Sequence, residues 1–592
     1  MATTYDNWQK PTRTEGLNRL LARTYAINWE IVVYAVILAI ALVTRFAGLG
    51  DRVMSHDESL HTYYSWRLFT EGDFQHTPLM HGPILFHVTA FSYFLFGDND
   101  FTARIYPAVL GVLMVMFPIL FRRWLGRIGA ILASVMILIS PMLLFHHRYI
   151  REDTPSIFAT MIMVYCIFQY LDGTIRARRK PIWLYIFAGA LLWNLGSKES
   201  AFIYVAIFGA FLTLYFGVRL YQHWRKSPSR DLYYFIMMSI LFGVVLTLIM
   251  IVVLNITLYE SETLSARIAA VGEGFRLLFS GGTPSEGFST FVSWTLLVAA
   301  FTLAVIILTA LWASLKTRKL RTRDIVVILL LTGAAFLGSI VAEEISQEPT
   351  RQERTAETES VEPVTVADIS YAPIIASWVV ALVVIGALIY SRRANWWRTL
   401  YRFRELDVLI VMGSLILPWL TAITLKLAGA DPTDYSSTGI SRTVVALIPF
   451  MSISIAFGLT WHWKRWLISA AVFYALYIFF FTTMFTNPTG LASGMIGSLG
   501  YWLKQQGVER GSQPQYYYSL IIMPIYEYLP LIGSFLAMLA GFTIFWRRRQ
   551  ERQVDALPET VSEDGETIAY ASSTDAPAQA LRLGFHLDRA AG

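Results

Sequence analysis

The amino-acid sequence predicts an all-α integral membrane protein, a polytopic bundle of about fourteen transmembrane helices. The first observation is composition: 55% of the 592 residues are hydrophobic and 15% are charged, whereas a soluble chain carries about 25% charged residues. The second is that the apolar residues form runs long enough to cross a bilayer as helices. The third is that basic residues cluster at every second connection between these runs, which is typical of a multi-pass membrane protein.

The apolar runs define the candidate spans. They lie near 30–47, 103–121, 128–146, 155–171, 182–197, 201–219, 232–254, 292–314, 324–342, 373–391, 406–428, 443–461, 465–486 and 527–546. One further run, Pro83 to Phe96, is too short to cross comfortably. We therefore expect an interfacial helix there, within the first outer connection, 48–102.

Charge sets the expected orientation. The connections rich in Lys and Arg are 122–127, 176–180, 225–230, 316–323, 392–404, 464–465 and 547–549. Basic connections face the cytoplasm, so both termini are expected inside a multi-pass protein of the cell membrane. The net charge of +6 is then explained by the basic cytoplasmic connections and does not indicate nucleic-acid binding. The single cysteine, Cys166, lies in an apolar run, which excludes a disulfide framework and a cysteine-based metal site.

Composition also divides the chain into four parts. In order, they are a cytoplasmic N-terminal segment (1–29), a membrane module with charged outer connections (30–220), the remaining membrane helices with outer loops at 255–291, 343–372 and 487–526 (221–546), and a disordered cytoplasmic tail (547–592). The tail is polar and poor in large apolar residues, a composition that cannot bury a core.

Acids and bases gather in three of the expected outer connections. These are "HDE" at 56–58, "RED" at 151–153 and "KES" at 198–200, each next to an apolar span. Charges near the hydrocarbon region cost roughly 2.5–3.5 kcal/mol each on insertion scales and tend to be functional. Because the predicted topology puts all three on one side, we expect Asp57 and Asp153 to share one outer cavity.

These residue types suit a reaction on a lipid phosphate held at the membrane edge. A carboxylate can act as a general base, which makes Asp57 the candidate. Arg binds phosphate as a fork and Lys as a point charge, so the phosphate-binding candidates are Arg148, Arg151 and Lys198.

The same cluster also fits a divalent metal, with His56, Asp57 and Asp153 as ligands and Glu152 as a further oxygen donor. No spacing here is diagnostic, and the sequence fixes no cofactor. His56 and His61 stay open between metal ligand, hydrogen-bond partner and interface residue. His81 and His87 are expected to be interfacial residues, with the polar end of each ring, its polar tip, directed to the membrane surface.

An ordered set of motifs resembles a known class. They are "HDES", "HTPLMHGPILFHVTAFSYFLFG", "DNDFTARIYPAVLG", "SPMLLFHHRYIREDTPSIF" and "GSKESAF", all within 30–220. Their order and topology resemble the GT-C membrane glycosyltransferases, which include the protein O-mannosyltransferases and the lipid A aminoarabinose transferase. The segment "QPQYYYSLIIMPIYEYLP" at 513–530 resembles the flippase-activity-associated family of archaeal-type surface glycosylation. That family's Glu-Lys…Pro-Trp-Leu element is replaced here by "GISRTVVALIPF" at 439–450.

The resemblance implies a GT-C bundle with an extracytoplasmic active site. It implies an inverting transfer of one sugar from a polyprenyl-phosphate donor to a lipid, glycan or protein acceptor, without nucleic acid. Asp57 would be the catalytic base with Glu58 beside it, and Asp153 with Glu152 would be the second acidic position. The residues near the donor phosphate would be Arg148, Arg151, Lys198 and, from a late span, Arg442.

Two other interpretations stay open. A flippase or transporter would move a lipid-linked sugar without chemistry, and such proteins show internal repeats and interrupted helices at midplane. No clear repeat is present and the distinctive groups lie at one face, which favours an enzyme. A catalytically inactive subunit of a glycosylation pathway is the other interpretation, because the altered segment 439–450 leaves retained activity open. The sequence does not name the sugar, the acceptor, the prenyl chain or the oligomeric state.

Overall fold

The computed structural model describes residues 29–172, 180–226, 371–391, 400–505 and 517–554, together with the single positions 273, 274, 276, 277, 288 and 292. Every regular element in these ranges is helical, and they contain no strand. The chain divides into two compact units, and each is described by itself. The predicted all-α class is confirmed for the described residues.

The first unit comprises Met1–Ala47, Gly111–Arg148 and Gln515–Gly592. Its helices are α2 (Trp29–Phe46), η2 (Phe117–Phe121), α7 (Arg122–Ile139), α8 (Pro141–His146), η6 (Tyr517–Ile522), α23 (Met523–Tyr526) and α24 (Tyr528–Val554). One face of α2 packs against α7 through a small apolar cluster that contains Tyr34, Ala41 and Leu138. The other face of α2 exposes large apolar side chains, as a lipid-facing helix does.

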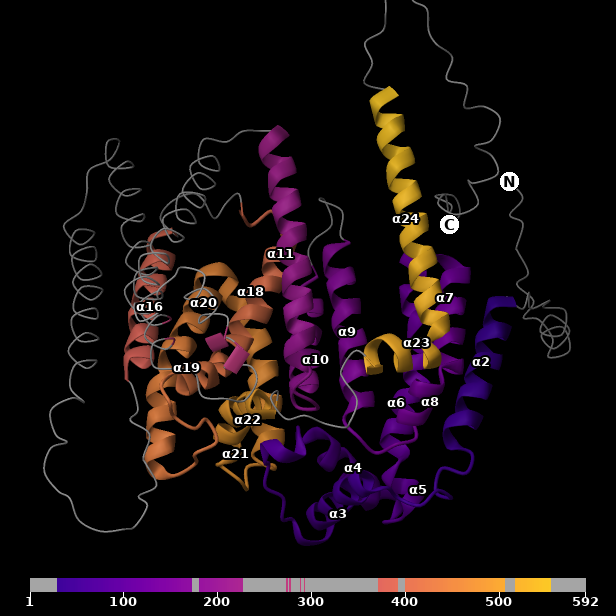
Figure 1. Cartoon of the computed structure of the whole chain (residues 1–592), viewed down its shortest axis with the longest axis horizontal. Coiled ribbons are helices and arrows are strands. Elements are labelled where there is room, and N and C mark those ends of the chain that lie inside the picture. Colours follow the sequence, from indigo (N-terminus) through magenta and orange to yellow (C-terminus); the bar gives the residue numbers. More distant parts are fainter. Residues whose placement is uncertain are drawn as a thin grey trace, which may run out of the picture. The chain divides into compact units, whose positions relative to one another are not determined.

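The second unit comprises Gly48–Leu110 and Tyr149–Pro514. Its helices are α3 (His56–Glu71), η1 (Pro78–Met80), α4 (Ile84–Phe96), α5 (Asp100–Ala103), α9 (Asp153–Leu171), α10 (Ile182–Leu195), α11 (Ala201–Lys226), α16 (Ala372–Ser391), α18 (Arg404–Ile416), η4 (Leu417–Leu420), α19 (Thr421–Leu427), α20 (Ser437–Phe481), α21 (Gly490–Ala492), η5 (Ser493–Gly497) and α22 (Ser498–Gln505). The helix α6 (Ile105–Met116) runs from this unit into the first. Within the second unit, α10 packs chiefly against α9 and α20 and also contacts the following helix, α11 (Figure 1).

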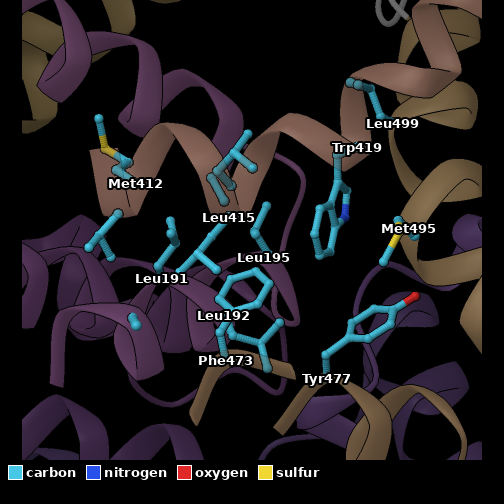
Figure 2. Packing of buried hydrophobic residues seen from close by; sticks show 14 of the residues in the cluster. Leu191, Leu192, Leu195, Met412, Leu415, Trp419, Phe473, Tyr477, Met495 and Leu499 are labelled. Atoms are coloured by element: carbon cyan, nitrogen blue, oxygen red, sulfur yellow. The ribbon is translucent and has the colours of Figure 1, made fainter. Parts of the chain in front are cut away.

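The largest apolar core lies where α10, α18 and α20 meet. Trp419 packs edge-on against Phe473 and Tyr477, with ring centroids 5.4 and 5.5 Å apart, and leucines of α10 lie against the same group (Figure 2). Lipid tails are as apolar as leucine, so helices in a bilayer associate through this kind of close packing. This core holds α10 in place, and the turn that follows α10 carries Lys198.

Six described helices are long and apolar enough to cross a membrane. They are Trp29–Phe46, Ile105–Ile139, Asp153–Leu171, Ala201–His223, Arg404–Leu427 and Ser437–Phe481. A bent pair, Leu520–Tyr526 and Pro530–Ile544, would be a seventh. The multi-pass helical prediction is confirmed, but the count of about fourteen is not established. The predicted spans 232–254, 292–314 and 324–342, the loop 343–372 and the chain beyond 554 lie outside the described residues, apart from single positions.

Backbone breaks divide two of these helices, α7 and α20. Gly126, between two predicted spans, adopts φ 73°, ψ 174° inside α7; glycine reaches positive φ without steric cost. His462 adopts φ −134°, ψ 78° inside the 45-residue α20. A straight helix of that length would measure roughly 68 Å at 1.5 Å per residue, far more than the roughly 30 Å of one crossing. Both breaks therefore fall where the sequence predicts one span to end and another to begin.

The first connection predicted to be outer, 48–102, is largely helical. The stretch that begins "SHDES" forms α3, which ends at Gly72 in the left-handed region (φ 67°). The predicted short helix Pro83–Phe96 forms as α4, with Gly97 (φ 80°) after its last residue. The existence of this helix is confirmed; its place at the membrane interface stays a prediction. The result is two short helices that pack together and carry the charged residues described next.

Candidate active site

Four charged side chains form a continuous row in the second unit. Arg151 Nη1 lies 2.9 Å from Asp57 Oδ2, and Arg151 Nε lies 3.5 Å from Asp153 Oδ2. Lys198 Nζ lies 2.5 Å from Asp153 Oδ1. We call Asp57, Arg151, Asp153 and Lys198 the charge row. The side chains are between 22% and 41% exposed, so a substrate in solvent or at the membrane edge can reach them.

Local structure explains how three distant segments supply this row. Asp57 is the second residue of α3 and Asp153 is the first of α9. Backbone N–H groups at a helix N-terminus favour negative charge, so both carboxylates sit where their helices stabilise them. Lys198 lies in the turn between α10 and α11, and its backbone N–H donates to the Asn194 carbonyl at the end of α10. The structure therefore brings Asp57 and Asp153 together through Arg151.

Glu58, next to Asp57, has a different environment: it is fully buried. The guanidinium of Arg104 donates two hydrogen bonds to the Glu58 carboxyl group, with Nε 2.9 Å from Oε1 and Nη2 3.1 Å from Oε2. The backbone N–H groups of Ser55 and Ile150 also donate to it, and Arg52 Nη2 lies 2.7 Å away. These donors satisfy both oxygens of the buried carboxyl group, which would be costly to leave unpaired. Glu58 joins the start of α3 to the segment that leads into α9.

Glu152, next to Asp153, is also fully buried. Its Oε1 lies 2.7 Å from Nε2 of His61, which is itself almost buried on α3. Among the described residues, no hydrogen bond reaches either carboxylate oxygen of Glu152, so His61 is its close neighbour but not a well-aligned donor. The two acidic pairs therefore divide in the same way: Asp57 and Asp153 are half-buried, whereas Glu58 and Glu152 are fully buried.

A second histidine–carboxylate pair lies beside the charge row. His81 Nδ1 is 2.6 Å from Glu199 Oε2, and Glu199 follows Lys198 in the same turn. Burial lowers the pKa of His81, but the hydrogen bond to Glu199 and the charges of Glu199 and Glu152 outweigh it, so the pKa of His81 is raised. Our expectation that His81 is a polar tip at the interface misses this pairing.

The late part of the chain packs against the same first connection. Thr483 Oγ1 donates to the Phe74 carbonyl at 2.8 Å, and His76 Nδ1 lies 2.8 Å from Ser493 Oγ. His76 Nε2 lies 3.0 Å from the His81 carbonyl. These contacts, from residues more than 400 positions apart, fix the loop that carries His81.

Other predicted residues lie outside the charge row. Arg148 belongs to the first unit, where its Nη1 donates to the carbonyls of Thr44 and Ala47 at 2.8 Å. Arg442 lies near the start of α20, and its charge acts on Asp434; among the described contacts none joins it to the row. His56 is exposed at the start of α3. The roles proposed for these residues stay predictions.

The described geometry gives no support to the metal prediction. Within the ranges that the structure describes, no three His, Cys, Asp or Glu side chains gather in a way that could hold an ion. Asp57 and Asp153 face the cations Arg151 and Lys198 instead. The metal set His56, Asp57 and Asp153 therefore does not fit this arrangement.

One feature of the site could have been found in the sequence. The spacing Ser55-x-x-Glu58 is the capping-box pattern of a helix start, and it predicts that α3 begins there with Glu58 turned back to its own backbone. Arg104 lies in the motif "DNDFTARIYPAVLG" and Glu199 lies in "GSKESAF", but neither motif indicates the partner, which lies 46 or 118 residues away. Only the folded arrangement identifies these partners.

Comparison with known proteins supports the class that the motifs resemble. A family model described as dolichyl-phosphate-mannose-protein mannosyltransferase matches residues 79–260. The match supports the GT-C class. The matched stretch includes Arg151, Asp153 and Lys198, whereas Asp57 and Glu58 precede it.

One curated relative is an uncharacterised protein of Aquifex aeolicus (strain VF5). It is 26% identical over 168 residues, which cover 27% of this chain and 33% of the relative. The chain thus matches about a third of that relative's length. No solved structure matches the chain.

Proposed function

We propose that this chain is a membrane glycosyltransferase. It transfers a sugar from a polyprenyl-phosphate donor to a hydroxyl group of a lipid, glycan or protein acceptor at the extracytoplasmic face, with inversion. The observation that carries the proposal is the charge row, in which half-buried carboxylates alternate with half-buried cations. The family match over 79–260 supports the donor class.

The row contains the two kinds of group that the reaction needs. Asp57 Oδ2 faces Arg151, and no described residue donates to Asp57 Oδ1. This oxygen is free to take the proton of the acceptor hydroxyl. The acceptor oxygen then forms a bond to the anomeric carbon from the face opposite the phosphate, while the bond from that carbon to the phosphate oxygen breaks. The bonding electrons leave with the polyprenyl phosphate.

The leaving phosphate gains negative charge as the bond breaks, and cations stabilise it. Arg151 and Lys198 are the two cations of the row, and the carboxylates of Asp57 and Asp153 hold them in place before substrate binds. Placing groups in advance lowers the cost of reorganisation in the transition state. Asp153 therefore acts through Lys198 and Arg151 rather than on the sugar.

Glu58 and Glu152 take positioning roles in this proposal. Both side chains are fully buried, so they hold the starts of α3 and α9 rather than contact substrate. The resemblance had put them among the catalytic acids. Their burial leaves Asp57 as the base on the exposed side of its pair.

Purified membranes that contain the chain test the proposal with a panel of radiolabelled polyprenyl-phosphate sugars, with and without a chelator. We expect transfer of label from at least one donor to lipid, glycan or protein, with release of polyprenyl phosphate and an inverted linkage. Movement of the donor between leaflets with no product would contradict the proposal and favour a flippase. Loss of transfer with the chelator would show that the reaction needs a metal ion and would favour the predicted ligands His56, Asp57 and Asp153.

A further inference from the structure

His81 is held in a backbone conformation that side chains rarely adopt. Its φ is 62° and its ψ is −153°, a region that is almost restricted to glycine. Such strain persists only where the surroundings enforce it, and it clusters at functional sites. Here the conformation carries the imidazole to Glu199, with Nδ1 2.6 Å from Oε2. The side chain is 28% exposed.

Two backbone hydrogen bonds join this loop to the turn that carries Lys198. The N–H of Gly82 donates to the Ser197 carbonyl, and the N–H of Ile84 donates to the Gly196 carbonyl, both at 3.1 Å. A Cβ on Gly82 would lie 2.0 Å from the Gly196 oxygen, so only glycine permits this approach. His81 and Lys198 therefore come from two segments that are fixed to each other.

Three neighbouring segments place titratable or charged groups around the His81 imidazole. Glu199 and Lys198 come from the α10–α11 turn, and Glu152, with His61 against it, comes from the start of α9 and from α3. His76 contacts the His81 carbonyl. Burial and Lys198 disfavour the imidazolium, while Glu199 and Glu152 favour it and prevail, which raises the pKa of His81. A protonated ring with Nδ1 directed to Glu199 keeps Nε2–H as a donor.

We propose that His81 is a proton-dependent cation of the donor-phosphate site, which binds the phosphate through Nε2–H alongside Lys198 and makes donor affinity depend on pH. The inference rests on the proposed function and names a regulation of the same site. In this inference His81 binds the donor phosphate, and Asp57 keeps its proposed role as the general base. Donor affinity is then highest at low pH, where His81 is charged, and falls as the pH rises through the pKa of His81.

Binding of a polyprenyl methyl phosphate diester to the purified full chain in lipid nanodiscs, measured from pH 5.5 to 8.5, tests this inference. A diester keeps one negative charge over this range, so the probe itself does not titrate. We expect affinity to fall by about tenfold with rising pH, the effect of losing one charge-assisted hydrogen bond. His81→Lys should bind with little pH dependence, and His81→Gln should bind at the weak, high-pH level throughout.

Two further variants separate a binding role from a structural one. Glu199→Gln should move the midpoint of the binding curve to lower pH, because it removes the charge that favours the imidazolium. His223→Gln, a histidine near the far end of α11, should match the unsubstituted chain at every pH. A flat curve for the unsubstituted chain, or an unchanged curve for His81→Gln, would overturn the inference.

The probe carries no sugar, so this result is independent of turnover. Sugar transfer together with a flat binding curve would overturn the inference about His81 and leave the proposed function intact. A pH-dependent binding curve that requires His81, with no transfer from any donor, would contradict the proposed function instead. In that case His81 would serve a phosphate-binding site without chemistry.

Discussion

Two adjacent acids differ at the residue scale because of helix geometry. Successive residues on an α-helix point about 100° apart, so Asp57 and Glu58 cannot share an environment. Glu58 turns inward to Arg104, and Asp57 turns outward to Arg151. The roles that we propose, Asp57 as the base and Glu58 as a buried structural carboxyl group, rest on this difference in direction.

Loss of Arg104 should destabilise the fold. Arg104→Met leaves the buried Glu58 carboxylate without its fork, and removal of one partner of a buried ion pair costs about 3–5 kcal/mol. We expect a lower thermal midpoint for the purified chain in detergent. The combined change Arg104→Met with Glu58→Leu should recover much of the loss, because it removes both charges. Unchanged stability with lost transfer would place Arg104 at the substrate instead.

Arg151 should not tolerate lysine. Its guanidinium contacts Asp57 and Asp153 at once, and a lysine ammonium cannot reproduce that fork. We expect Arg151→Lys to cut kcat/KM for the donor at least tenfold. Arg67→Lys is the matched control, because Arg67 bridges Glu71 and Asp73 on the exposed side of α3. Equal effects of both substitutions would refute a specific role for Arg151.

The sequence predicted much of the site at this scale. "HDE", "RED" and "KES" were expected to meet at one face, and Asp57, Arg151, Asp153 and Lys198 do meet. The sequence could not tell which acid of each pair is buried, because that depends on how α3 and α9 pack. Arg148 was predicted to bind phosphate together with Arg151. It instead donates to the Thr44 carbonyl at the end of α2, in the first unit.

At the scale of elements, the turn between α10 and α11 presents both Lys198 and Glu199. It is fixed from one side by the core around α10 and from the other by the loop at Gly82. The sequence indicated this turn by its polar residues between two apolar spans. Its attachment to the first outer connection was not predictable, because backbone hydrogen bonds between distant loops leave no pattern in side chains.

Substitution of Gly82 tests this attachment. Gly82→Ala would put a methyl group 2.0 Å from the Gly196 oxygen, so one of the two loops must move. We expect a higher donor KM and at least a tenfold loss of transfer, measured in membranes at matched protein levels. The control is Gly217→Ala in α11, where an added Cβ meets nothing within 4 Å. Wild-type kinetics for Gly82→Ala would show that the joined loops do not position Lys198.

At the scale of the whole molecule, hydropathy and basic connections predict a helical membrane protein, an orientation and about fourteen spans, and the described residues confirm the helical class. Six described helices meet the length and hydropathy expected of a span, while α10 and part of α16 are shorter apolar helices. Length alone cannot decide such cases, since short helices can cross a thinned bilayer or lie within protein. The orientation of the chain therefore needs its own measurement.

Labelling of single introduced cysteines gives that measurement. Cys166 is buried, so the unmodified chain should label weakly with a membrane-impermeant maleimide. We expect Asp73→Cys to label in intact cells and Arg123→Cys to label only after permeabilisation. The reverse pattern would place the charge row on the cytoplasmic side and contradict the proposed site of transfer.

The central claim is that Asp57 deprotonates the acceptor in a sugar transfer. The most direct test compares Asp57→Asn with Asp73→Asn, an exposed aspartate that also pairs with an arginine. Transfer from a polyprenyl-phosphate sugar is measured in membranes with equal amounts of each variant. Loss of a general base costs roughly 10²–10⁴-fold, so Asp57→Asn should lose at least a hundredfold while Asp73→Asn keeps the wild-type rate. Normal turnover by Asp57→Asn would contradict the account.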